Sequence, residues 1–201
     1  MPQKKPLAEH PVFKAVLLFF IALIVSVILW LKVKDHYCYM ITFAASKVFA
    51  MIEGFALEEF EVRGDAFYLS LNFIKGSKKV SLVSLLSSNI SRYYVFNVPL
   101  TLSLLVSLSW FIKKRKRAFT EALAMLLLSH FIYVFCAEAA IIKEQTMLSG
   151  IEPVNTSRLS VYQYLWKVTE FIVMAFGPFL IAAYVFVRYA LSLNSKARPR
   201  P

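Results

Sequence analysis

The sequence is 201 residues long; 59% of its residues are hydrophobic, whereas only 17% are charged. A soluble domain has about 25% charged residues, so this composition, with a mean hydropathy of +0.61, excludes an ordinary soluble domain and favours an integral membrane protein. The net charge of +11 would suit nucleic acid, but the charges lie between apolar segments and form no binding motif. We therefore expect no nucleic-acid partner.

The first predicted element is a membrane span over residues 12–31, VFKAVLLFFIALIVSVILWL. About 20 apolar residues in a helix cross a bilayer, and Lys14 lies close enough to one end to reach the interface. The preceding Lys4 and Lys5 suggest a signal peptide as an alternative. Because the apolar run is longer than a usual signal core and no small-residue cleavage site follows it, we expect the span to be retained.

Residues 32–93 form the longest segment between predicted spans. An apolar stretch of about 13 residues from Met40 is too short to cross a bilayer, so we expect an interfacial helix over residues 36–57. Alternating apolar and polar residues then predict strands at about 58–63, 66–74 and 79–84.

These strands predict a small antiparallel β-meander with turns at Arg63–Asp65 and Lys75–Lys78. Its apolar face should rest on the helices, because an isolated hairpin is only marginally stable. We also expect the apolar residues of the central strand to dock a protein partner. These residues are Phe67, Leu69, Leu71 and Phe73.

Three further spans are predicted at residues 94–112, 118–142 and 164–189. Pro99 falls near the start of its span, where a missing amide costs least, whereas Gly177-Pro178 lies mid-span and predicts a kink. The fold class expected is therefore an all-α membrane protein, with four spans in one domain over residues 1–201. Its remaining parts are an outer loop at 143–163 and a disordered tail at 193–201.

Basic residues predict the orientation of these spans. More than half of the 23 Lys and Arg residues lie on the side that holds both termini and the loop after the second span. The positive-inside rule places this side in the cytoplasm and the meander outside. That loop carries five consecutive basic residues, which also suit contact with anionic lipid headgroups. They are Lys113, Lys114, Arg115, Lys116 and Arg117.

Ionisable residues within the spans are the candidates for chemistry, because charge in a bilayer is costly. His130 lies mid-span, Glu170 lies at a comparable depth in the last span, and Cys136 could act with them as a nucleophile. The structural alternative pairs Glu170 with Lys167 and gives His130 a hydrogen bond to a neighbouring helix. We favour this alternative, because Cys136 and His130 are six residues apart and point to different helix faces.

The two cysteines, Cys38 and Cys136, both lie near the outer surface in this topology. They either form a disulfide or remain as buried apolar thiols. The sequence has no CxxC or HExxH spacing, so we expect no metal and no cofactor.

The order of these elements resembles a known family. The N-terminal span, the strand pair LEEFEVRGDAFYLSLNF, the segment NISRYYVFNVPLTLSLLVSL and the Gly-Pro span YQYLWKVTEFIVMAFGPFLIAAYVF are together similar to the exosortase H-associated membrane proteins. These are small multi-pass proteins of Gram-negative bacteria, encoded beside an exosortase, a transpeptidase-like membrane enzyme that processes proteins with a C-terminal sorting helix.

The resemblance implies a location in the bacterial inner membrane and a non-catalytic accessory role, in which the chain docks the exosortase or its substrate. It transfers no catalytic residues to this sequence. Two other functions stay open. One is a membrane-embedded cysteine peptidase, for which Cys38, Cys136, Arg92 and His36 are available. The other is a small lipid-binding or transport component, although no inverted repeat is evident.

Overall fold

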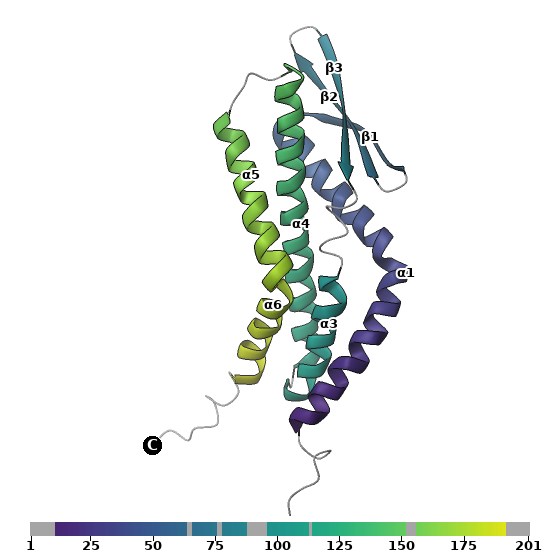
Figure 1. Ribbon diagram of the computed structural model, residues 1–201, viewed down its shortest axis with the longest axis vertical. Helices are drawn as coiled ribbons and strands as arrows, with labels where there is room; N and C mark the ends of the chain where they lie inside the picture. Colours follow the sequence, from purple (N-terminus) through teal and green to yellow (C-terminus); the bar gives the residue numbers. More distant parts are fainter. Residues whose placement is uncertain are drawn as a thin grey trace, which may run out of the picture. The chain divides into compact units, whose positions relative to one another are not determined.

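The computed structural model describes residues 11–63, 66–75, 78–87, 96–112, 114–151 and 156–191 (Figure 1). In chain order the elements are α1 (Pro11–Glu53), β1 (Ala56–Arg63), β2 (Ala66–Lys75), β3 (Lys78–Ser87), α3 (Asn97–Leu108), the 3₁₀ turn η2 (Ser109–Phe111), α4 (Arg115–Leu148), α5 (Thr156–Phe171), the π-helical turn η3 (Ile172–Phe176), α6 (Gly177–Phe186) and a second π-helical turn η4 (Val187–Leu191). A mostly helical chain with a small antiparallel sheet is thereby confirmed.

Contacts between residues divide the chain into two compact units. The first comprises Met1–Val33, Phe96–Leu126 and Phe176–Pro201, and the second comprises Lys34–Val95 and Leu127–Ala175. Both long helices, α1 and α4, contribute their N-terminal parts to the first unit and their C-terminal parts to the second.

Helix α1 is continuous where the sequence predicted a span at 12–31 and a separate interfacial helix at 36–57. That prediction of a break was wrong, because residues 12–53 contain neither Gly nor Pro, and Lys and Asp cost only a fraction of a kcal/mol inside a helix. The helix ends at Gly54, which has a φ of +73°, and the N–H of Phe55 donates to the carbonyl oxygen of Ala50 at 2.7 Å. This is the Schellman motif, in which glycine adopts the left-handed conformation without strain.

Helix α4 ends in the same way. Gly150 has a φ of +67°, its N–H donates to Met147 O at 3.1 Å, and the N–H of Ile151 donates to Thr146 O at 3.0 Å. The helix therefore runs six residues beyond the predicted boundary at 142, and the outer loop predicted at 143–163 includes the end of α4 and the start of α5.

Within the described chain, two helices are long and apolar enough to cross a membrane, α1 and α4, where the sequence predicted four spans. The segments Asn97–Phe111 and Gly177–Tyr189 are apolar but shorter. The last predicted span is interrupted by η3, immediately before Gly177-Pro178. Because proline lacks an N–H and its ring clashes with the preceding turn, the predicted irregularity falls where the sequence placed it.

The three strands form one antiparallel sheet in the order β1-β2-β3, in agreement with the predicted meander. Arg63 pairs with Ala66 and Lys75 with Lys78, so both hairpins close where turns were predicted. The central turn residues, 64–65 and 76–77, lie outside the described residues. The register of β1 shifts between Leu57 and Glu59, which is the signature of a β-bulge.

The sheet packs on the C-terminal part of α1, within the second unit (Figure 1). Phe60 of β1 makes edge contacts with Tyr39 and Phe43 of α1, at ring-centroid distances of 5.3 and 5.4 Å. Leu71 of β2 joins the buried cluster that contains Phe49 of α1. The predicted contact between the apolar face and the helices is therefore present.

Three of the four residues predicted to dock a partner are covered within this chain. Phe67, Leu69 and Leu71 have exposed fractions of only 6%, 0% and 1%. Their apolar surface is already covered by this chain, because a three-stranded sheet needs a packed face to be stable. Phe73 lies in β2 opposite Val80, and its side chain is not among those described.

Candidate functional site

Three polar pairs join α1 to α4 in the second unit. The hydroxyl of Tyr37 lies 2.6 Å from Nδ1 of His130. Ser46 Oγ lies 2.9 Å from Glu138 Oε1. Glu53 Oε2 lies 2.5 Å from Nζ of Lys143. From one pair to the next, the residue number increases in α1 and in α4 alike, so the two helices run parallel in this unit. We call these three pairs the polar ladder.

Most side chains of the ladder are buried. His130, Ser46 and Glu138 are completely buried, and Lys143 is 4% exposed. Buried polar groups destabilise a protein unless they are hydrogen-bonded, so each pair fixes the alignment of the two helices at its level. Hydrogen bonds of this kind also hold helices together in membranes.

The outermost pair extends into a network of three side chains. The hydroxyl of Tyr162, on α5, donates to Glu53 Oε1 at 3.0 Å, while Lys143 pairs with the other carboxylate oxygen. Burial, and then the hydrogen bond to Glu53, raise the pKa of Tyr162. Tyr162 therefore stays protonated at neutral pH and acts as the donor. Lys143 also lies 5.7 Å from the centre of the Phe55 ring, within cation–π range.

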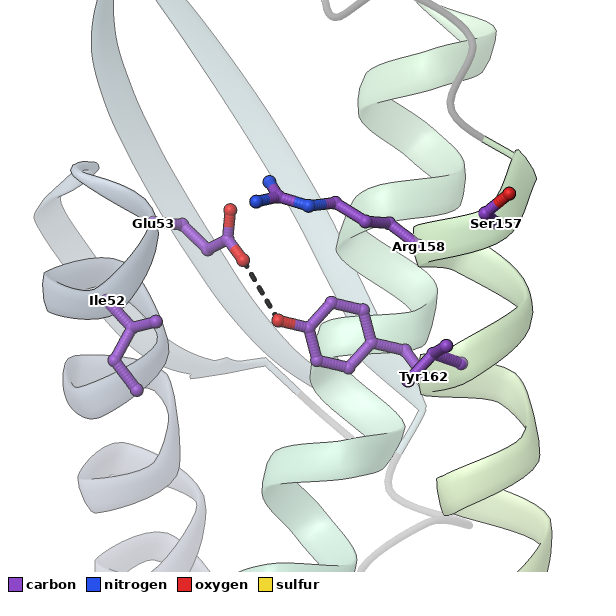
Figure 2. Close-up of a pocket in the computed structure, with 6 residues that line it drawn as sticks. Ile52, Glu53, Ser157, Arg158 and Tyr162 are labelled. Carbon is purple, nitrogen blue, oxygen red and sulfur yellow. Dashed lines mark hydrogen bonds between the residues drawn. The ribbon is translucent and has the colours of Figure 1, made fainter.

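An open cleft of about 450 Å³ lies beside this network. Its walls come from the end of α1 and the start of α5, and they are formed by Ile52, Glu53, Ser157, Arg158, Val161 and Tyr162. Figure 2 shows the side chains of Arg158 and Tyr162 directed from α5 toward Glu53. The cleft thus offers charged groups of both signs, two hydroxyls and two apolar side chains, which suits a peptide segment better than a purely apolar ligand.

Each residue of the predicted catalytic set contacts a side chain outside the set. His130 bonds to Tyr37, Cys136 contacts the hydroxyl of Thr169, and Lys167 Nζ lies 3.4 Å from Glu170 Oε2 on the outside of α5. The two pairings of the structural alternative, Glu170 with Lys167 and His130 with a neighbouring helix, are therefore confirmed.

The cysteines form no disulfide and no metal site is present among the described residues. Cys38 and Cys136, both in the described part of the chain, are buried and are not joined by a disulfide. Arg92 lies outside the described residues. Among the residues that are described, no group of three or more His, Cys, Asp or Glu side chains could hold a metal ion.

The basic run lies in the first unit, at the start of α4. Lys113 is outside the described residues, Lys114 precedes the helix, and Arg115, Lys116 and Arg117 form its exposed first turn. Cations at a helix N-terminus oppose the helix dipole, so local helix stability does not explain their presence. Arg117 donates to Glu121 at 3.2 Å, and Glu121 also pairs with Arg188 at 3.3 Å. The basic run and the end of the last helix therefore share one end of this unit.

Comparison of the chain with protein families, curated proteins and solved structures found no match. The fold and the site thus define a class only: a largely helical protein with two helices able to cross a membrane, a buried polar ladder and an open cleft at one end of it.

Proposed function

We propose that this chain is an integral protein of the bacterial inner membrane that acts as a non-catalytic accessory of an exosortase-type sorting system. In this role it docks the enzyme or its substrate. The observation that carries the docking role is the cleft beside Glu53 and Tyr162, because these two wall residues are already joined by a hydrogen bond. A preorganised site loses little entropy when a partner binds.

Membrane insertion is supported by the surface of α1. Large apolar side chains along its N-terminal part are at least half exposed, and they include Val12, Val16, Phe20, Ile24, Ile28 and Leu31. Soluble monomers rarely expose a continuous apolar surface of this kind. In a bilayer the same surface contacts lipid, and each Å² removed from water contributes about 25 cal/mol.

The parallel direction of α1 and α4 supports further crossings of the membrane by this chain. If two parallel spans, α1 and α4, both cross the membrane, the chain between them must return across it. Helix α3 with η2 is the helical part of that connection, and its serines are satisfied locally: Ser103 donates to Pro99 O at 2.5 Å, and Ser107 to Leu104 O at 2.8 Å. Such bonds suit an apolar environment. The helical segment from Thr156 to Leu191 is long enough for the final return.

The positive-inside rule gives the orientation of this proposal. Arg115–Arg117 and Arg188 lie at one end of the first unit, joined through Glu121, and we place that end in the cytoplasm. The C-terminal ends of α1 and α4, with the sheet and the cleft, are then periplasmic. A sorting substrate is processed on that side, so the cleft would be accessible to it.

The non-catalytic role is supported by the separate partners of Cys136, His130 and Glu170. A nucleophile and its base must lie within hydrogen-bond reach, whereas His130 is engaged by Tyr37 and Glu170 by Lys167. None of the three lines the cleft.

The test is site-specific photo-crosslinking in native membranes. A photoreactive amino acid replaces Val161, an exposed residue of the cleft, or Ile132, an exposed residue of α4 outside it. We expect an adduct with the exosortase or a sorting substrate at position 161, identified by mass spectrometry, and none at position 132. Equal adducts at both positions, or lipid adducts alone, would refute docking at the cleft.

A further inference from the structure

Glu138 occupies the middle level of the polar ladder, and its carboxyl group is completely buried. Its hydrogen-bond partner among the described residues is Ser46 of α1, whose Oγ lies 2.9 Å from Oε1. The second carboxyl oxygen, Oε2, has no hydrogen-bond partner there, and neither has the hydroxyl of Thr42, one helical turn before Ser46. Thr42 is itself only 2% exposed.

The hydrogen bonds of Ser46 indicate the protonation state of Glu138. Ser46 Oγ also lies 2.8 Å from the carbonyl oxygen of Thr42, to which it donates. A carbonyl oxygen can only accept, and a serine hydroxyl has a single proton to give. If that proton goes to Thr42, the contact between Ser46 and Glu138 is a full hydrogen bond only when the carboxyl group supplies the second proton.

The charged groups around Glu138 are consistent with a neutral acid. On α4, Lys143 lies five residues further on and pairs with Glu53, while His130 lies eight residues earlier and bonds to Tyr37. On α5, Tyr162 donates to Glu53. Within the described chain Glu138 forms no ion pair, and an ionised carboxylate buried without a partner would cost several kcal/mol.

We propose that Glu138, with Ser46 and Thr42, forms a buried proton-binding site between α1 and α4. The bound proton stays on Oε1, which donates a hydrogen bond to Ser46 Oγ, and the Ser46 hydroxyl donates its own hydrogen bond to the carbonyl oxygen of Thr42. The ligand of this site is a single proton. Its release would leave a carboxylate in the apolar interface, so the close packing of α1 on α4 depends on its occupancy. This inference concerns the helix pair alone and does not require the docking function.

Infrared spectroscopy of the full chain in lipid vesicles at neutral pH tests this site. A protonated carboxyl group has a C=O stretching band that a carboxylate lacks. We expect this band in the wild-type protein and its loss in Glu138→Gln. The glutamine keeps a donor toward Ser46, so this variant should fold. The control is Glu121→Gln, because Glu121 is paired with Arg117 and Arg188 and should contribute no such band.

A second variant keeps the test decisive if Glu138→Gln does not fold. In Ser46→Ala the acid loses its hydrogen-bond acceptor, so the same band should persist but move to higher frequency. A wild-type spectrum without a protonated-carboxyl band, or a band unchanged in both Glu138→Gln and Ser46→Ala, would overturn the proposal.

Discussion

Lys143 Nζ lies 2.5 Å from Glu53 Oε2, and this buried ion pair joins the C-terminal ends of α4 and α1. Tyr162 adds a third helix by donating to the other oxygen of Glu53. A buried pair contributes less than its Coulomb energy because both ions lose their hydration, but removal of one partner leaves a buried charge. The pair therefore matters most for alignment of the three helix ends.

The first prediction concerns this pair. Lys143→Met should lower the free energy of unfolding by less than the ~3–5 kcal/mol of a fully uncompensated buried charge, because Tyr162 still donates to Glu53 and Arg158 is directed toward it. The double variant Glu53→Gln/Lys143→Met should recover most of this loss. Unfolding by a denaturing detergent, followed by circular dichroism, measures both. The control is Glu61→Gln, which removes an exposed pair with Arg63 and should leave the midpoint unchanged. A double variant as unstable as the single one would contradict this account.

The second prediction concerns the helix ends. Gly54→Ala and Gly150→Ala should each destabilise the protein by about 1 kcal/mol, because a Cβ atom is strained in the left-handed conformation. Space is not the reason, since no heavy atom lies within 4 Å of a Cβ added at either position. Asn tolerates this conformation better than Ala, so Gly150→Asn should lose less stability than Gly150→Ala. Equal melting temperatures for Gly150→Asn and Gly150→Ala would argue against the Schellman assignment.

Several local elements could be read from sequence, because their signals depend on residues close together in the chain. Alternation of apolar residues predicted all three strands, and Gly177-Pro178 predicted the helix irregularity. The full length of α1 is not evident from sequence because the charged residues Lys32–Asp35 interrupt the apolar run, although nothing in them breaks a helix. As a result, Tyr37, Ser46 and Glu53 were assigned to a separate helix and not to α1.

The partners in the ladder could not be read from sequence, because they are about 90 residues apart. His130 was recognised as a buried polar residue that needs a partner, but Tyr37 had been assigned to a separate interfacial helix. One signal was available: Thr42, Ala45 and Ser46 are small residues at helical spacing, as at close helix–helix contacts. The burial of Leu69 and Leu71 likewise depends on packing, since an alternating strand shows that one face is covered but not by what.

The third prediction concerns topology. Alkaline phosphatase fused after Gly150 should be active, because the end of α4 is periplasmic in the proposed orientation, whereas a fusion after Lys114 should be inactive. The two fusion points flank α4 alone, so they test whether this helix crosses the membrane. Equal activity of both fusions at equal protein levels would remove α4 as a span.

The fourth prediction concerns the cysteines. Cys136→Ser should change the yield of processed sorting substrate by less than about twofold, because loss of a catalytic nucleophile would cost orders of magnitude. Cys38→Ser should behave in the same way, since Cys38 is also buried and in no disulfide. Processing of a tagged substrate, followed by immunoblotting at matched protein levels, measures this. Abolished processing in Cys136→Ser with normal folding would favour the peptidase alternative.

The last prediction uses the Tyr162 hydroxyl. Burial, and then the hydrogen bond to Glu53, raise its pKa above the ordinary value of 10.0. Below that value the hydroxyl is protonated in both folded and unfolded chains, and its hydrogen bond contributes fully. Above pH 10.0 the unfolded chain releases the Tyr162 proton first, so the free energy of unfolding falls as the pH rises toward the pKa of Tyr162 in the folded chain. Unfolding midpoints from about pH 8 to about pH 11 should therefore decline less steeply in Tyr162→Phe than in wild type.

Tyr162→Phe should also be less stable at neutral pH, because Glu53 loses a donor. The matched control is Tyr164→Phe, on the same helix and 69% exposed, whose alkaline slope should equal that of wild type. The two variants remove the same hydroxyl group from one helix, so a difference between their slopes reports the contact with Glu53 and not tyrosine ionisation in general. Identical slopes in all three proteins would mean that Tyr162 does not hold this hydrogen bond.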